Sequence, residues 1–176
     1  MQNETTVAEL MEADHVELDG LLAELIIELN SDRRDVVSTY QRLDLFWARL
    51  AVHIRAEHLV VFPAVKDIAK VISKGPCDIA AILQELRSDH DFLIKELARA
   101  VKAMRLVPDF GNESETFEIV RDLVSQVKRR LERHNQIEEE MIYPLAAEAD
   151  TEHAQLMIRD NALRELENLP HRFKTT

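Results

Sequence analysis

The sequence predicts an all-α fold: an up-down antiparallel four-helix bundle with a short extra C-terminal helix. The 176 residues include only three glycines and five prolines, and Leu, Ala, Glu and Arg are frequent. Four long segments carry apolar residues at alternating steps of three and four, which keeps one helical face turned inward. Short connections favour antiparallel neighbours. We expect a single domain over 1–176, with the bundle core at about 7–146 and a helical extension at about 151–168.

The first helix is predicted to begin after Thr6, because Thr6-x-x-Glu9 has the form of a capping box. The polar run 30–35 ends it. Its inward stripe is Met11, His15, Leu18, Leu22, Leu25 and Leu29.

The second helix has an inward stripe of the same period, made of Leu43, Phe46, Leu50, His53, Glu57 and Val60. Pro63 follows. Proline lacks an N–H and its ring clashes with the preceding turn, so we expect the helix to kink or break there. A further helical piece is expected to continue until Lys74-Gly75-Pro76 stops it.

The third and fourth helices follow the same pattern. The stripe of the third, which should end near Pro108, is Ile79, Leu83, Leu86, His90, Leu93, Leu97 and Met104. After a break at 109–115, the stripe of the fourth is Val120, Val124, Val127, Leu131, His134, Glu138, Met141 and Leu145. Beyond Pro144, a shorter helix should pack Leu156, Leu163 and Leu166.

One pattern of metal-binding residue types occurs twice along these stripes. A single histidine is followed downstream by His-x-x-x-Glu, and a proline stands six residues after the glutamate. The candidate metal ligands in chain order are His15, His53, Glu57, His90, His134 and Glu138. All six occupy stripe positions, where a bundle core otherwise favours leucine. The repetition predicts two half-sites that face each other across a pseudo-twofold axis.

Residues four apart lie on one face of a helix, so each His/Glu pair can reach one metal. Imidazole nitrogen with carboxylate oxygen suits iron, manganese or zinc. Unpaired, six such groups in a core would each cost several kcal/mol. A lone stripe histidine is more often a hydrogen-bonded core residue, and one His-x-x-x-Glu is more often a solvated pair. The doubled pattern favours the metal site.

Other polar and aromatic residues are expected to play lesser parts. His58 should lie at the rim of the site or contact a ligand from outside. Residues expected to face solvent are Asp14, Asp89, Asp91, Glu139, Glu140, His153 and His171. Aromatic residues expected in the core or at its rim are Tyr40, Trp47 and Tyr143.

The chain resembles the hemerythrin-like, or HHE cation-binding, domains over roughly residues 7–146. The matching segments are EADH at His15, HIRAEHLVVFP from His53, SDHD at His90 and HNQIEEEMIYP from His134. The resemblance implies a bundle with two iron ions, a non-haem di-iron centre bridged by two carboxylates and an oxo or hydroxo group. It implies that Glu57 and Glu138 bridge, that His15 and His53 serve one metal, and that His90 and His134 serve the other.

The sequence departs from the oxygen-carrying hemerythrins, which use five histidines and an aspartate after the last one. Here there are four stripe histidines and a glutamate, so both metals would keep an exchangeable position. This favours sensing of, or chemistry with, O2, peroxide or nitric oxide over oxygen storage. A redox or iron-centre repair enzyme and a metal-dependent regulatory or interaction module are the alternatives, and manganese or zinc is an alternative to iron.

The composition excludes several partners. A net charge of −11 argues against binding to nucleic acid and to anionic membranes. The N-terminal residues lack a basic start and an apolar signal core, and the single Cys77 fits a reducing compartment, so we expect a cytoplasmic protein. Cys77 itself reads as an inert residue at a helix start. A homodimer and an unidentified protein partner are both compatible with this surface.

Overall fold

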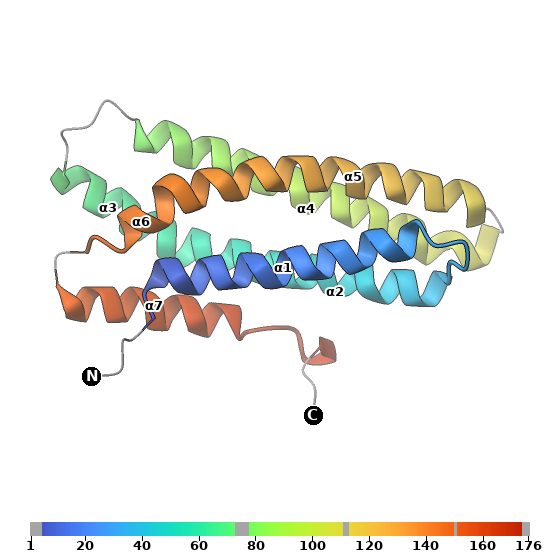
Figure 1. Cartoon of the computed structure of the whole chain (residues 1–176), viewed down its shortest axis with the longest axis horizontal. Helices are drawn as coiled ribbons and strands as arrows, with labels where there is room; N and C mark the ends of the chain where they lie inside the picture. The colour runs from blue at the N-terminus through green and yellow to red at the C-terminus, as the bar shows by residue number, and fades with distance from the viewer. Residues whose placement is uncertain (1–4, 73–77, 111–112, 150, 174–176) are drawn as a thin grey trace.

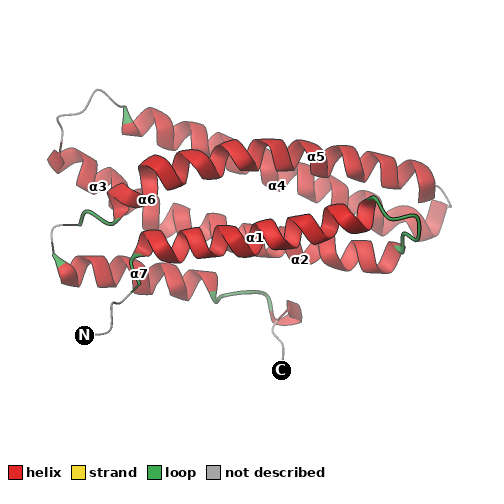
Figure 2. Cartoon of the chain, in the orientation of Figure 1, coloured by secondary structure: helices red, strands yellow, loops and turns green. Residues whose placement is uncertain are grey.

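The computed structural model describes residues 5–72, 78–110, 113–149 and 151–173, and over these residues every regular element is a helix (Figure 2). The four long helices are α1 (Val7–Leu29), α2 (Val36–Ala56), α4 (Ile79–Phe110) and α5 (Glu113–Ile137). Successive long helices run in opposite directions (Figure 1). The predicted up-down bundle is therefore confirmed. The expected helix stop at 74–76 and Cys77 lie outside the described residues.

The long helices close into a ring, because α1 packs on α2, α2 on α4, α4 on α5, and α5 on α1. The predicted C-terminal helix is α7 (Glu152–Leu166), which lies outside this ring against α1 and α2 (Figure 1). Leu166 is buried there, and Arg55 of α2 donates to Oε2 of Glu165 at 2.7 Å. A short 3-10 turn, η3 (His171–Phe173), follows.

Polar side chains begin the helices where the sequence allows it. Thr6 accepts a hydrogen bond from the Glu9 N–H at 3.2 Å, and the Glu9 carboxylate accepts one from the Thr6 N–H at 2.7 Å. The predicted capping box is therefore confirmed. Asp35 caps α2 and Thr151 caps α7 in the same way, each accepting from the backbone N–H three residues on. These caps satisfy N–H groups that have no partner inside the helix.

Both prolines that follow the His/Glu pairs interrupt α-helical hydrogen bonding through a π-helical turn. The turns are η1 (Glu57–Val61), which leads into α3 (Phe62–Ile72), and η2 (Glu138–Ile142), which leads into α6 (Tyr143–Ala146). In each, the N–H of the residue before proline bonds the glutamate carbonyl five residues back. The interruption expected at Pro63 is confirmed. The backbone stays helical there, and the π-turn contains one residue more than an α-helical turn.

The inserted residue shifts the inward stripe by one position. The sequence placed Val60 and Met141 on the stripe, but both are only half-buried, while Val61 and Ile142 are fully buried. A π-turn contains one residue more than an α-turn, so every residue after it rotates relative to the preceding helix. The predicted register is correct up to the glutamates and wrong beyond them.

The apolar core is divided in two. One buried cluster fills the end of the bundle that contains the α1–α2 and α4–α5 connections, and includes Leu25, Phe46, Leu97 and Val124. The other lies where α3, α6 and α7 gather, and includes Met11. Between the clusters, the same helices present buried histidines and acids. The fold therefore has a polar layer across its long axis.

No helix among the described residues combines the length and apolar character needed to cross a bilayer.

The capping box gives a stability prediction. Replacing Thr6 by alanine leaves the Glu9 N–H without its side-chain acceptor, so the free energy of unfolding should fall by about 1 kcal/mol. Thr5→Ala, at the neighbouring exposed position, is the control and should change the stability by less than half as much. Urea unfolding followed by circular dichroism measures both. Equal effects of the two substitutions would mean that the box does not stabilise α1.

Candidate metal centre

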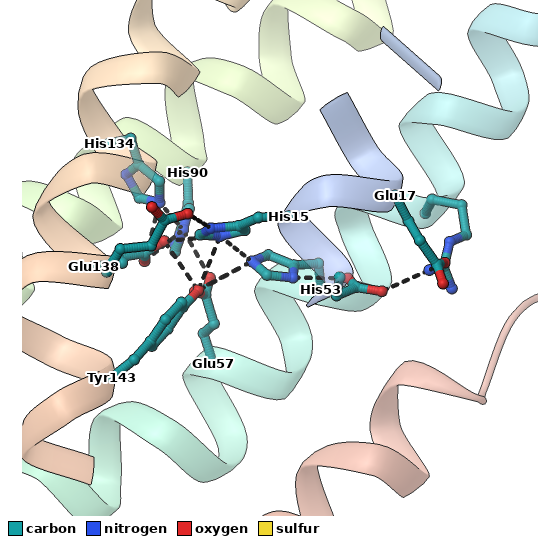
Figure 3. A network of polar contacts seen from close by, with 11 residues as sticks. His15, Glu17, His53, Glu57, His90, His134, Glu138 and Tyr143 are labelled. Carbon is teal, nitrogen blue, oxygen red and sulfur yellow. Dashed lines mark hydrogen bonds and ion pairs between the residues drawn. The ribbon is translucent and has the colours of Figure 1, made fainter. Parts of the chain in front are cut away.

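The polar layer contains all six residues that the sequence selected, and Figure 3 shows them converging from four helices. His15 comes from α1, His53 from the last turn of α2, His90 from α4 and His134 from the last turn of α5. Glu57 and Glu138 are the first residues of the two π-turns. Every one is at most 2% exposed. The six side chains that the repeated pattern selected therefore lie together in the folded chain.

The six side chains form two overlapping groups of donors. The first donor group consists of His15, His53, Glu57 and Glu138, and the second donor group consists of Glu57, His90, His134 and Glu138. Within each group, one nitrogen or oxygen atom per residue lies within 4.8 Å of all the others. Both glutamates belong to both groups, so the arrangement suits two neighbouring cations that share two carboxylates.

Glu57 directs one oxygen to each group. Its Oε1 lies 3.3 Å from Nε2 of His53, and its Oε2 lies 3.1 Å from Nε2 of His90. Its carboxylate therefore spans the two histidine pairs.

Glu138 spans them from the opposite helix. Its Oε2 lies 3.5 Å from Nε2 of His15, and its Oε1 lies 3.0 Å from Nε2 of His134. Each of the two carboxylates therefore faces both histidine pairs.

Some polar atoms of the centre make no hydrogen bond with the other side chains. Glu57 Oε2 and Glu138 Oε1 are buried and make no hydrogen bond, although His90 Nε2 lies 3.1 Å from the first and His134 Nε2 lies 3.0 Å from the second. In each pair of histidines, the two Nε2 atoms face each other, 3.1 Å apart between His15 and His53 and 2.8 Å apart between His90 and His134. Buried carboxylate oxygens without donors are costly. A cation in each group would accept lone pairs from all these atoms, so the residues present fit a dinuclear site.

The outer nitrogens of the first histidine pair are bound by acids. His53 Nδ1 lies 2.9 Å from Asp14 Oδ2, and Arg49 donates to the other oxygen of Asp14 at 2.6 Å. His15 Nδ1 lies 2.7 Å from Oε1 of Glu139. The expectation that Asp14 faces solvent is wrong, whereas Glu139 is exposed as expected and in addition contacts His15. Asp14 is only 6% exposed, while the Glu139 side chain is 43% exposed.

The second pair has corresponding contacts from corresponding positions. His134 Nδ1 lies 3.6 Å from Asp89 Oδ2, and Arg130 lies 3.2 Å from the other oxygen of Asp89. His90 Nδ1 lies 2.8 Å from Nε2 of His58. Asp89 is 4% exposed, so its predicted solvent position is also wrong, whereas the predicted outer contact of His58 is confirmed. Such contacts orient an imidazole and set which nitrogen is free for a metal.

The ionisable groups shift one another strongly. Burial disfavours a charged imidazole at His53, but the Glu57 carboxylate and the hydrogen bond to Asp14 outweigh burial and raise the pKa of His53 to about 10. Burial likewise opposes the charge on His134, yet Glu138 and Asp89 raise its pKa to about 10. Without a cation, protonated imidazoles therefore neutralise the carboxylates, and metal uptake must release those protons.

Tyr143 is the residue whose part sequence reasoning missed. It was expected in the core or at its rim, and it is indeed fully buried, but its hydroxyl donates to Glu57 Oε1 at 2.7 Å. Burial, together with the charges of Glu138 and Glu57, raises the pKa of the phenol well above its usual value. The sequence did contain a signal for this role. Tyr143 stands five residues after Glu138, and the corresponding residue of the other half, five residues after Glu57, is Phe62.

The remaining predicted positions agree with the structure. The side chains that are exposed are Asp91, Glu140, His153 and His171, and those that are half-buried are Tyr40 and Trp47. None of them belongs to the two donor groups.

Searches for similarity add nothing to this picture: no protein-family model, no curated protein and no solved structure matches the chain.

Proposed function

We propose that this chain is a non-haem di-iron protein of the hemerythrin-like type. In this proposal the first donor group binds one iron, the second donor group binds the other, and the two shared glutamates bridge them. The observation that carries the proposal is the sharing itself: two groups of buried nitrogen and oxygen donors overlap at Glu57 and Glu138. A structural site for a single ion would need only one such group.

Iron is among the metals that the donor chemistry suits. Each group offers two imidazole nitrogens and two carboxylate oxygens, a set that suits iron, manganese or zinc. Iron bound there would supply reversible binding of, or electron transfer to, O2, peroxide or nitric oxide. We propose these small molecules as the ligands, because all six donors are buried in a layer that is flanked on both sides by apolar clusters.

The protein's own residues hold this centre in place. Two imidazoles come from the interior of α1 and α4 and two from the ends of α2 and α5, so four helices must pack before the donors converge. Asp14 hydrogen-bonds His53 from outside, Asp89 faces His134 at 3.6 Å, and each aspartate is itself contacted by an arginine. Preorganisation of this kind makes a metal site selective and tight.

A redox enzyme that uses the same centre is the second candidate. The observation that favours it is the contact of Glu139, whose side chain is 43% exposed, with the buried His15. This contact connects the centre to solvent, which a reaction that consumes protons would need. Turnover of peroxide or nitric oxide by the loaded protein distinguishes the candidates, since binding without turnover supports a sensor or carrier.

Metal analysis tests the central proposal. Protein produced with iron should contain about two irons per chain and show near-ultraviolet bands of an oxo-bridged ferric pair. His53→Ala removes one donor and should lower the iron content, whereas His153→Ala, at an exposed position of α7, should not. An iron content below one per chain that His53→Ala leaves unchanged would reject a di-iron protein.

The two aspartates that contact the histidines from outside should influence the affinity for metal. Asp14→Asn and Asp89→Asn keep the shape but weaken the orientation of His53 and His134, so each should weaken metal affinity by about 10–100-fold. Asp91→Asn is the matched control, because Asp91 also adjoins His90 in sequence but is exposed. Competition with a chromophoric chelator measures all three. If the control weakens binding as much as the other two, then net charge rather than orientation sets the affinity.

Removal of the metal should destabilise the bundle. A ligand that binds only the folded state at about 100 times its Kd adds about 2.7 kcal/mol per site to the free energy of unfolding. For a chain of this size, loss of both ions should lower the Tm by on the order of 10 °C. Calorimetry of loaded and chelator-treated protein measures the change, and the treated His53→Ala variant should respond little to added iron. An unchanged Tm in the wild type would argue against a cation in the polar layer.

A further inference from the structure

The histidines and glutamates of the two donor groups correspond one to one, but the buried aromatic residue that follows each glutamate differs. Each glutamate is followed after five residues by an aromatic residue and then by proline, and each aromatic residue begins the helix after a π-turn. In the half that begins with Glu57 this residue is Phe62, and in the half that begins with Glu138 it is Tyr143. The difference is one hydroxyl group, and it lies inside the polar layer.

The Tyr143 hydroxyl lies among the donors of the first group and reaches all four of them. It is 2.7 Å from Glu57 Oε1, 3.0 Å from His15 Nε2, 3.2 Å from Glu138 Oε2 and 3.4 Å from His53 Nε2. These are the atoms through which the first group would hold a cation. Figure 3 shows the ring entering from one side, with its oxygen at the point where the contacts meet.

The corresponding ring in the second half offers no donor. Phe62 is 1% exposed and stacks on His90, with centroids 5.8 Å apart and planes 10° apart. It covers an imidazole that belongs to the second donor group but contributes no oxygen to that group. The first group therefore has five protein donors within reach and the second has four.

We propose that the Tyr143 oxygen is the fifth protein ligand of the metal in the first group, and that small molecules bind at the metal of the second group. This rests on the proposed di-iron function. The phenol proton, donated to Glu57 in the structure, leaves to solvent when the oxygen binds the cation, because a bound cation reverses the local preference for the neutral form. Tyrosinate is a protein ligand that ferric iron accepts, as in haem catalases.

A Tyr143 ligand changes the number of exchangeable positions that the sequence led us to expect. Six ligands alone leave an exchangeable position on both metals, whereas a seventh ligand on one metal leaves the open position on the other. The half-sites then differ in function although their histidines and glutamates correspond.

Optical and resonance Raman spectra of iron-loaded protein test the assignment. The wild type should show a visible phenolate-to-iron(III) charge-transfer band. Tyr143→Phe should abolish the band while about two irons per chain remain. The chain has only two tyrosines, so Tyr40→Phe is a matched control and should keep the band. Tyrosine deuterated in its ring should shift the enhanced Raman modes of the wild type, which tests the ligand even if Tyr143→Phe does not fold.

Azide titration tests the inequality of the two metals. The wild type should bind one azide per di-iron centre, and Tyr143→Phe, which frees the second position, should bind two. A wild type with two irons, no phenolate band and two azides would overturn the inference and leave the proposed function standing. A wild type that retains less than one iron per chain would instead overturn the proposed function.

Discussion

The fold depends on one electrostatic constraint: a layer of ionisable side chains crosses the core between two apolar clusters. Glu57 and Glu138 are completely buried, and an uncompensated buried carboxylate costs far more free energy than a marginally stable domain can tolerate. Four imidazoles reach these two acids, one from each long helix. The apolar stripes on either side hold the helices at the separation at which those contacts form. Packing and charge compensation are therefore satisfied together or not at all.

The repeated prolines give this layer its shape. A regular α-helix could not accept Pro63 or Pro144 without losing a hydrogen bond and meeting a steric clash. Each chain segment instead inserts a residue, and the π-turn begins at the glutamate itself. The insertion turns the next aromatic residue inward, which brings Phe62 and Tyr143 to the layer. A backbone requirement of proline thus decides which side chains reach the donors.

Much of this arrangement was predictable from the sequence, because helical periodicity is a strong signal. The six donors, the capping box at Thr6 and the antiparallel order follow from spacing alone. Other features follow from contacts between helices that spacing on one helix does not describe. Asp14 precedes the stripe and was expected to face water, yet α2 packs there and offers His53 and Arg49. The shifted register after Glu57 and Glu138 was missed because the π-turn adds a residue that the 3.6 period does not contain.

The two halves differ in more than Tyr143. His53 has a close contact with Asp14 at 2.9 Å, whereas His134 stands 3.6 Å from Asp89 and its Nδ1 has no hydrogen-bond partner. The outer group on His15 is a carboxylate, and the one on His90 is the imidazole of His58, whose pKa burial and the neighbouring His90 lower. These two differences, together with the hydroxyl group of Tyr143, give the first half stronger anionic support and leave the second half less constrained. In the proposed di-iron function, the first donor group therefore holds its metal more firmly, and the second donor group is the one at which a ligand exchanges.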